Sequence, residues 1–328
     1  MTQIIETVDF MQSGKQVGWL RVPHSVTRSG YGVIPVPVAV WRNGDGPAIL
    51  LTAGTHGDEY EGQVVLTRLV QTLQAEKMRG LLIVIPSLNT AAAIAGTRVS
   101  PEDDGNLNRA FPGDAFGGPT WKIADYLFNQ LIPMVDVVGD FHGGGTSMSY
   151  RPHASTHYSP EAPQELKARS LAAVKALGVP HVAILESVSG GGGMSTATRH
   201  HGKIYLNGEY GGTGSLTPDS ITLVDGAVQR LLAFFGSTDR EFAALPEPEV
   251  LRLYGHVYVS EPGVFVPFTR LGQFVSTGDR CGELVFPENP ERAAIPIHFE
   301  RSGVVVCQRH PARVDRGDCV AHLAGPDE

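Results

Sequence analysis

The segment PAILLTAGTHGDEYEGQVVLTRLVQTL (47–73) decides the fold class of this chain. It opens with an apolar run (47–53), passes through a loop with glycines and acidic residues, and continues with Val65, Leu69 and Leu73 at helical spacing. A short, continuously apolar run that precedes an amphipathic helix is typical of a buried strand in an α/β protein. The segment therefore predicts a strand, a polar loop and a helix, in that order.

The same alternation continues to about residue 240. Three further apolar runs, at 81–86 (LLIVIP), 135–141 (VDVVGDF) and 181–185 (HVAIL), predict buried strands. Helical patterns lie between and after these runs, and their apolar positions are Ile123, Leu127, Leu131, Leu166, Ala173, Leu177, Val228, Leu231, Leu232 and Phe235. Strands as apolar as these need cover on both faces. We therefore expect an α/β fold with a mixed, largely parallel sheet flanked by helices.

The composition changes after this alternating part. Residues 236–250 (GSTDREFAALPEPEV) are polar and rich in proline and acid, which predicts a linker. The linker would separate an α/β domain at 1–240 from a β-rich domain at 250–328.

The second domain carries an internal repeat. The sequence VSTGD (275–279) recurs as VDRGD (314–318), and each copy follows a Gly-Val pair. A duplicated hairpin of this kind predicts a small, all-β, barrel-sandwich-like domain, which resembles the lipoyl and biotinyl carrier modules. Those modules need a lysine at the exposed turn, and this chain has none after Lys203. We therefore expect a structural role, an oligomer contact or a cover over the site.

Composition narrows the classes of partner. The net charge is -8 and no basic run could follow a phosphate backbone, so nucleic acid is not expected as a partner. No apolar run approaches about 18 residues, so no membrane span is expected, and the first residues do not resemble a signal peptide. The chain has three cysteines, an odd number, and none lies near another at metal-binding spacing. They indicate reduced thiols in a cytoplasmic protein.

Two polar motifs follow predicted strands directly. His56 and Glu59 come after the first strand, and His142 comes after the strand at 135–141. Loops that leave the carboxyl ends of strands converge on one crevice, so these side chains can meet. Two histidines and one glutamate are a typical ligand set for one catalytic zinc ion, although cobalt or manganese would also accept them. Asp140 lies on the same strand face as His142 and could orient its imidazole.

Three ordered motifs resemble one known family. GTHGDEYEG (54–62), GNLNRAFPG (105–113) and DFHGGG (140–145) are similar to motifs of the succinylglutamate desuccinylase/aspartoacylase family. That family belongs to the carboxypeptidase-like zinc hydrolases and also carries a β-rich C-terminal domain. Together with IPVPVAVWRNGDGP (34–47), the motifs look closest to the branch that deacetylates Nα-acetyl-2,4-diaminobutyrate in ectoine breakdown.

The resemblance also implies roles for individual residues. Glu209, in LNGEYGG (206–212), matches the glutamate that serves as the proton shuttle, although its relatives have a more apolar run before it. Glu186, after the strand HVAIL, is the competing candidate. The pair Asn108 and Arg109 resembles the pair that holds the substrate carboxylate, for which a planar guanidinium is suited. Arg98 does not match the spacing of the relatives cleanly. It could polarise the scissile carbonyl or stabilise the oxyanion, or else lie in an exposed loop.

Other catalytic patterns are missing from the sequence. It contains no G-x-S-x-G nucleophile elbow, no G-x-x-x-x-G-K-[ST] phosphate loop and no G-x-G-x-x-G after the first strand. We therefore expect a zinc-dependent amidohydrolase that removes a small acyl group, acetyl in the first instance, from an N-acyl amino acid. A metallocarboxypeptidase acting on peptides and a non-catalytic ligand-binding homologue stay open as alternatives. Self-association into a homo-oligomer also stays open.

Overall fold

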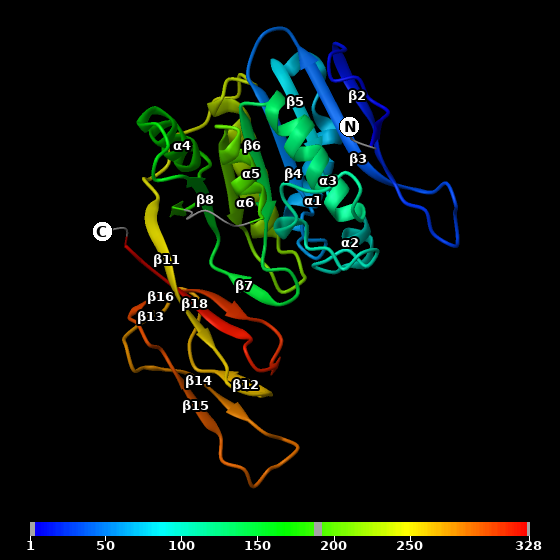
Figure 1. Ribbon diagram of the computed structural model, residues 1–328. Helices are drawn as coiled ribbons and strands as arrows, with labels where there is room; N and C mark the ends of the chain where they lie inside the picture. Colours follow the sequence, from blue (N-terminus) through cyan, green and yellow to red (C-terminus); the bar gives the residue numbers. More distant parts are fainter. Residues whose placement is uncertain (1–3, 187–191, 327–328) are drawn as a thin grey trace.

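The computed structural model describes residues 4–186 and 192–326, and within them fourteen strands form one long sheet (Figure 1). Thirteen strands follow one another along it in the order β1 (Ile5–Glu6), β2 (Gly14–Pro23), β3 (Val33–Asn43), β5 (Gly80–Ile85), β4 (Ala48–Ala53), β6 (Val137–His142), β10 (Ile204–Glu209), β8 (His153–Tyr158), β9 (His181–Glu186), β11 (Glu249–Tyr258), β18 (Cys319–Pro326), β16 (Gly303–Arg309) and β13 (Phe274–Val275). A short strand, β7 (Met148–Tyr150), pairs with β16 outside this path.

Parallel pairs occupy the centre of the sheet. β4 runs parallel to β5 and β6, β6 to β10, and β9 to both β8 and β11. Antiparallel pairs form both ends, with the hairpin of β2 and β3 at one end and the C-terminal strands at the other. The expected mixed sheet with helices on its faces is confirmed. β4, β5 and β6 are almost wholly buried. The apolar sequences of β4 and β5 predict this, whereas β6 buries Asp140 and His142 together with its apolar residues.

Helices cover both faces of the central strands. They are α1 (Glu61–Thr72), α2 (Thr90–Ala95), α3 (Pro119–Tyr126), α4 (Gln164–Ala176), α5 (Met194–His200) and α6 (Pro218–Phe234), with short turns η1 (Ala75–Lys77), η2 (Leu107–Arg109), η3 (Leu127–Leu131) and η4 (Ile132–Met134). One apolar core joins α1, α4 and α6 to the sheet, and a second core joins α3 and α5 to the opposite face. Within the described residues, none of these helices has the length and apolar character that a membrane crossing requires.

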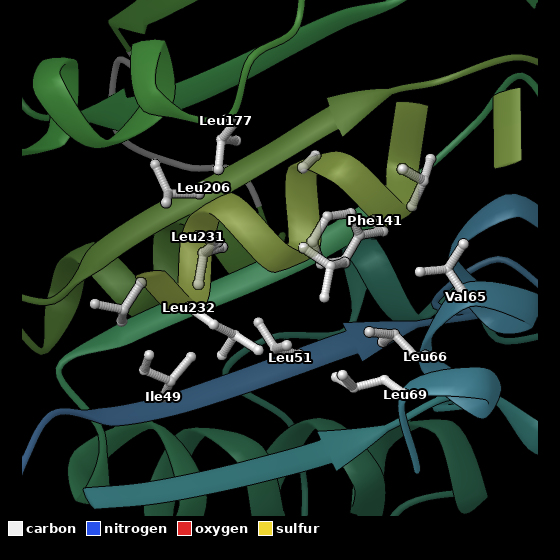
Figure 2. Close-up of a cluster of buried hydrophobic side chains, with 14 of the residues drawn as sticks. Ile49, Leu51, Val65, Leu66, Leu69, Phe141, Leu177, Leu206, Leu231 and Leu232 are labelled. Atoms are coloured by element: carbon white, nitrogen blue, oxygen red, sulfur yellow. The ribbon is translucent and has the colours of Figure 1, made fainter. Parts of the chain in front are cut away.

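The packing of α1 determines where the loop before it lies. Leu51 of β4 and Phe141 of β6 face the core under α1 and α6 (Figure 2). A Cβ at Gly62 would lie 2.7 Å from the Cβ of Phe141, closer than real Cβ atoms come. Glycine at this position therefore lets the first turn of α1 touch the sheet, which holds the preceding loop against the carboxyl ends of the strands.

The C-terminal strands form a sandwich with a core of its own. A second sheet of four strands, in the order β15 (Ile295–His298), β14 (Arg280–Val285), β12 (Gly263–Pro267) and β17 (Arg313–Val314), packs beside the end of the long sheet. The internal repeat of the sequence reappears as two matching turns. The backbone N–H of Ser276 donates to Asp279 Oδ2 at 2.7 Å, and that of Asp315 donates to Asp318 Oδ2 at 2.9 Å.

The segment between α6 and β11 contacts the α/β part at both of its ends. Ser237, near its start, is fully buried, and its carbonyl accepts the N–H of Arg79 at 2.8 Å. At its end β11 runs parallel to β9, with Val250 opposite Val182, so the backbone sheet continues into the C-terminal part (Figure 1). The division into domains at 1–240 and 250–328, with a linker at 236–250, stays a prediction.

Candidate active site

The residues expected to hold a metal lie together at the carboxyl ends of the central strands. His56 and Glu59 lie in the loop between β4 and α1, and His142 is the last residue of β6 rather than the first residue after it. Glu209, the last residue of β10, pairs in register with His142 on the neighbouring parallel strand. The crevice expected from the order of strands and loops is therefore present.

His56, Glu59 and His142 form a compact set of donors. Nδ1 of His56 lies 2.7 Å from Oε1 of Glu59, and Nδ1 of His142 lies 2.8 Å from its Oε2. The side chains are only 3–4% exposed, and their ligand atoms all lie within 4.8 Å of one another. Two imidazole nitrogens and a carboxylate that converge in this way fit a catalytic zinc site with three protein ligands.

Asp140 fixes the orientation of the His142 imidazole. Its Oδ2 lies 2.7 Å from His142 Nε2, which turns Nδ1 toward Glu59. The carboxylate is itself fully buried, and it accepts hydrogen bonds from Thr52 at 2.8 Å, Thr55 at 2.9 Å and Tyr205 at 3.3 Å. A ligating histidine whose second nitrogen is held by a carboxylate is a common feature of metal sites.

Neighbouring charges shift the pKa values of Glu59 and His142 against the effect of burial. Burial by itself raises the pKa of Glu59, but the neighbouring His56 and His142 outweigh burial and bring the pKa far below its ordinary value. Burial lowers the pKa of His142, whereas Asp140 and Glu59 raise it by more, so its pKa lies well above the ordinary value. The cluster thus attracts positive charge, from protons or from a metal ion.

The HGDE loop is held by backbone contacts that only glycine permits. A Cβ at Gly57 would lie 2.0 Å from the carbonyl carbon of Ala92 in α2, so any side chain there would push the loop away. Asp58 points to the other loop and accepts hydrogen bonds from the backbone N–H of Thr146 at 2.7 Å and from its hydroxyl at 2.9 Å. Asp58 therefore joins the loop after β4 to the loop after β6 and is not one of the metal donors.

Arg98 reaches the cluster from the loop after α2. Its Nη1 lies 3.3 Å from Nδ1 of His56 and 3.4 Å from Oε1 of Glu59, while its side chain is 45% exposed. The guanidinium therefore stands at the mouth of the site with one edge toward solvent. From this position it can donate to an oxygen that develops negative charge beside the metal donors.

Asn108 and Arg109 lie in η2, on the rim of the same cavity. Oδ1 of Asn108 accepts the backbone N–H of Met194 at 3.0 Å, which fixes its amide. Arg109 is exposed, and its Nη1 donates to the carbonyl of Asn108 at 2.7 Å. The guanidinium of Arg109 thus stands at the rim of the cavity, where a carboxylate can approach it from solvent.

One cavity of about 290 Å³ joins all of these groups. It also contains side chains that the sequence analysis did not select, namely Ser147, Met148, Tyr150 and Asn207. Asn207 was open to prediction, because it lies two residues before Glu209 on the same face of β10. The segment 147–150 carries no comparable signal in the sequence, because its place depends on pairing with a distant strand.

Tyr150 connects the cavity to the C-terminal sandwich. β7 pairs with β16, and in this ladder Tyr150 lies opposite Cys307. The charge of Glu209, burial and the thiol of Cys307 raise the pKa of Tyr150, so this phenol stays protonated and can donate a hydrogen bond. The C-terminal part thereby supports one wall of the site through backbone pairing.

Glu209 has the surroundings of a proton carrier. One carboxylate oxygen, Oε2, is buried and has no hydrogen-bond partner among the described residues. Burial, and then the nearby charge of Glu59, raise the pKa of Glu209 to about 8. A carboxyl whose pKa lies near neutrality can both accept and return a proton.

Two further predictions have different outcomes. Glu186, the competitor of Glu209, ends β9, which β10 and β8 separate from β6; its side chain lies outside the described part of the chain. The glycine run of the segment 189–196 (SGGGGMST) predicts irregular structure, either as a lid beside the site or as a surface loop. This was wrong for Met194 onward, because Met194 is fully buried and begins α5. Residues 189–191 lie outside the described residues.

Comparisons with known proteins agree with this arrangement. A family model described as the succinylglutamate desuccinylase/aspartoacylase catalytic domain matches residues 45–235. The chain is 37% identical over 325 residues to an N-alpha-acetyl-L-2,4-diaminobutyric acid deacetylase from Halomonas elongata, and the match covers 98% of this chain and 94% of that protein.

Solved structures with the same architecture span the whole chain. The product-bound ectoine utilization protein EutE (DoeB) from Ruegeria pomeroyi is 34% identical, with a TM-score of 0.94 and 99% of each chain covered. A succinylglutamate desuccinylase from a Silicibacter species is also 34% identical, with a TM-score of 0.94 over 100% of this chain and 99% of the other. The similarity therefore includes the C-terminal sandwich as well as the α/β part.

Proposed function

Because this chain belongs to the succinylglutamate desuccinylase/aspartoacylase family, we propose that it is a zinc-dependent deacetylase of Nα-acetyl-L-2,4-diaminobutyrate. The observation that carries the proposal is the unpartnered, buried carboxylate oxygen of Glu209, on the residue in register with His142. The similarity to the Halomonas deacetylase supports the choice of substrate.

The metal site would consist of His56, Glu59 and His142, with one zinc ion per chain. When bound, zinc lowers the pKa of a water molecule to about 7 and polarises the acyl carbonyl. The protein's part is to hold both imidazoles in place, which Asp140 does for His142 through their 2.7 Å contact.

Proton transfer would belong to Glu209. Its carboxylate takes a proton from the attacking water as the new C–O bond forms. It then gives that proton to the amide nitrogen, so that the C–N bond breaks and the products are a carboxylate and a free amine. The pKa of about 8 suits both directions of transfer near neutral pH.

Two arginines would bind the substrate carboxylate and stabilise the negative oxygen of the transition state. Arg109, with Asn108, holds the α-carboxylate at the rim, where a guanidinium can make two parallel hydrogen bonds. Arg98 faces the oxygen that becomes negative during attack, which is electrostatic stabilisation of the transition state. Among the described residues that line the cavity, these are the two arginines, and lysine does not occur. A second substrate carboxylate, as in a succinyl group, would therefore lack a cation, which favours acetyl.

The free thiols support a cytoplasmic location, which is part of the proposal. Cys281 and Cys307 are buried, Cys319 is partly exposed, and none of them forms a disulfide. Unpaired cysteines are usual in a reducing compartment.

The experiment is a substrate panel with zinc-loaded and chelator-stripped protein side by side. The panel contains Nα-acetyl-L-2,4-diaminobutyrate, N-acetylaspartate, N-succinylglutamate and a short peptide, and the readout is release of carboxylate and of free amine. We expect turnover of the acetyl-diaminobutyrate alone, lost on stripping and restored by zinc.

Other outcomes of the panel contradict the proposal in distinct ways. Release of C-terminal residues from the peptide would identify a carboxypeptidase. Silence across the panel with zinc bound would leave a ligand-binding role.

A further inference from the structure

A second cavity, of about 260 Å³, lies behind the active site. It shares Tyr150 with the active cavity, and the lining residues that matter here are Glu61, Ser149, Gly211, Thr217, Asp219 and Ser220. None of the described residues that line it is a lysine, arginine or histidine. The cavity is thus lined by acidic and neutral groups without an opposing cation.

Glu61 is the group that makes this cavity unusual. Its side chain belongs to the first turn of α1 and the residue is only 3% exposed. One carboxylate oxygen, Oε1, is buried and has no hydrogen-bond partner in the described part of the chain. Backbone N–H groups of Glu61, Gly212 and Tyr60 interact with the carboxylate, but no described cation forms an ion pair with it. Burying a carboxylate without a cation costs free energy.

The unpartnered oxygen lies at the cavity wall. A Cβ built on Gly211 would lie 2.1 Å from Oε1 of Glu61 and 3.7 Å from the Cβ of Ser220, and all three residues line the cavity. Glycine at 211 is what leaves room for this oxygen. The other oxygen, Oε2, would lie 2.9 Å from a Cβ at Gly143, a residue that lines the active cavity. The Glu61 carboxylate therefore stands between the two cavities.

The wall between the cavities is made of backbone that belongs to the active site. The N–H of Gly143 donates to Oε2 of Glu59 at 3.3 Å. The N–H groups of Gly144 and Tyr150 both donate to the carbonyl of Gly211, at 3.2 and 3.1 Å. An occupant beside Glu61 would thus brace the segment that follows His142.

We propose that this second cavity binds a compact monocation, either an alkali-metal ion or a primary ammonium group, against Oε1 of Glu61. One buried carboxylate balances one positive charge. The hydroxyls of Ser149 and Thr217 supply neutral oxygens in the same cavity. Divalent cations usually require more than one carboxylate or keep several waters, so a single buried carboxylate matches a monovalent ion. Asp219, the other acidic residue of the lining, is exposed and is not needed for the site.

The first test compares melting temperatures of the metal-loaded protein in four chloride salts at equal ionic strength. The salts are those of sodium, potassium, methylammonium and tetramethylammonium, and the last is too bulky for the site. We expect at least one small cation to raise the melting temperature by about 2–4 °C relative to tetramethylammonium. Methylammonium alone would identify an ammonium ligand, and sodium or potassium would identify an alkali ion.

Two variants locate the effect. Glu61→Gln keeps the shape of the side chain but removes its charge, and it should abolish the difference between the salts. Asp219→Asn, a matched change on the rim of the same cavity, should leave the difference intact. Equal melting temperatures of the wild-type protein in all four salts, or a difference that persists in Glu61→Gln, would overturn the proposal.

A direct measurement keeps the proposal testable if Glu61→Gln fails to fold. Rb⁺ stands in for K⁺ and ammonium and scatters anomalously, so crystals of the wild-type protein grown in rubidium chloride should show a peak beside Oε1 of Glu61. A peak there supports the site. Its absence, combined with equal melting temperatures in the four salts, contradicts it. Neither readout depends on which N-acyl amino acid is the substrate.

Discussion

The α/β part and the C-terminal sandwich bury different kinds of side chain. At the carboxyl ends of β4 and β6, the buried residues include ionisable groups, among them His56, Glu59, Asp140 and His142. In the sandwich, the described core consists of valine, leucine, phenylalanine, alanine and one cysteine. Burying a charge costs free energy unless it is paired, so a protein retains such groups where they do chemistry. The presence of buried ionisable groups therefore distinguishes the candidate active site from the C-terminal sandwich.

The two regions nevertheless meet at one wall of the site. β7 contributes Met148 and Tyr150 to the lining of the cavity, and Ser147 comes directly before it. β7 is held by backbone pairing to β16 of the sandwich. The N–H of His310 also donates to the carbonyl of Ser147 at 2.9 Å. Among the described residues that line the cavity, none that carries a charge comes from the sandwich, whose backbone contacts position Ser147 and Tyr150.

The largest effect on catalytic rate is expected from a substitution in the α/β part. Glu209→Gln removes the group that we propose as the proton carrier, so we expect kcat to fall by about 10²–10⁴-fold with the bound zinc retained. Steady-state kinetics and metal analysis of the same sample measure both quantities. Glu186→Gln, the same change at the end of β9, is the control and should keep wild-type activity. Full activity of a zinc-bound Glu209→Gln variant would refute the assignment.

A smaller effect, on zinc affinity, is expected at Asp140, which contacts His142 and is not itself a proposed metal ligand. Asp140→Asn replaces the carboxylate that holds His142, so zinc affinity should weaken by about 10–100-fold. Competition with a chelator measures this affinity. Asp136 is a useful control, because it is exposed and its carboxylate accepts the N–H of Ala48 at 3.0 Å, a backbone contact that Asn can also make. If Asp136→Asn and Asp140→Asn bound zinc alike, the contact with His142 would have no bearing on the metal.

The smallest effect on activity is expected in the sandwich. Leu284 is fully buried in its core, so Leu284→Ala should lower the free energy of unfolding by about 2–4 kcal/mol while leaving kcat unchanged well below the melting temperature. Chemical denaturation and kinetics on one preparation separate the two quantities. Val266→Ala, on the adjacent β12 and more than a third exposed, should cost much less stability. A large loss of kcat in folded Leu284→Ala would mean that the sandwich does more than support the wall.

Local pattern was enough to predict most of the central fold. β4 and β5 consist almost wholly of apolar residues, and β6 and β9 each contain a run of apolar residues, so these strands could be recognised from local sequence. The turns around Asp279 and Asp318 could be recognised in the same way, because they repeat a five-residue motif. The helix that begins at Met194 was missed, because the glycine run before it has no helical periodicity. What makes it a helix is burial of Met194 against the sheet, which is a tertiary effect.

The sequence by itself selected the side chains that could hold a metal, because zinc prefers imidazole and carboxylate ligands. His56 and Glu59 follow one buried strand, and His142 ends another. Only the tertiary structure decided which neighbours those donors have. The register of β10 against β6 sets Glu209 beside His142, and the pairing of β7 with β16 brings Tyr150 to the cavity. Pairing between distant strands depends on how the whole sheet assembles, and no short stretch of sequence contains that information.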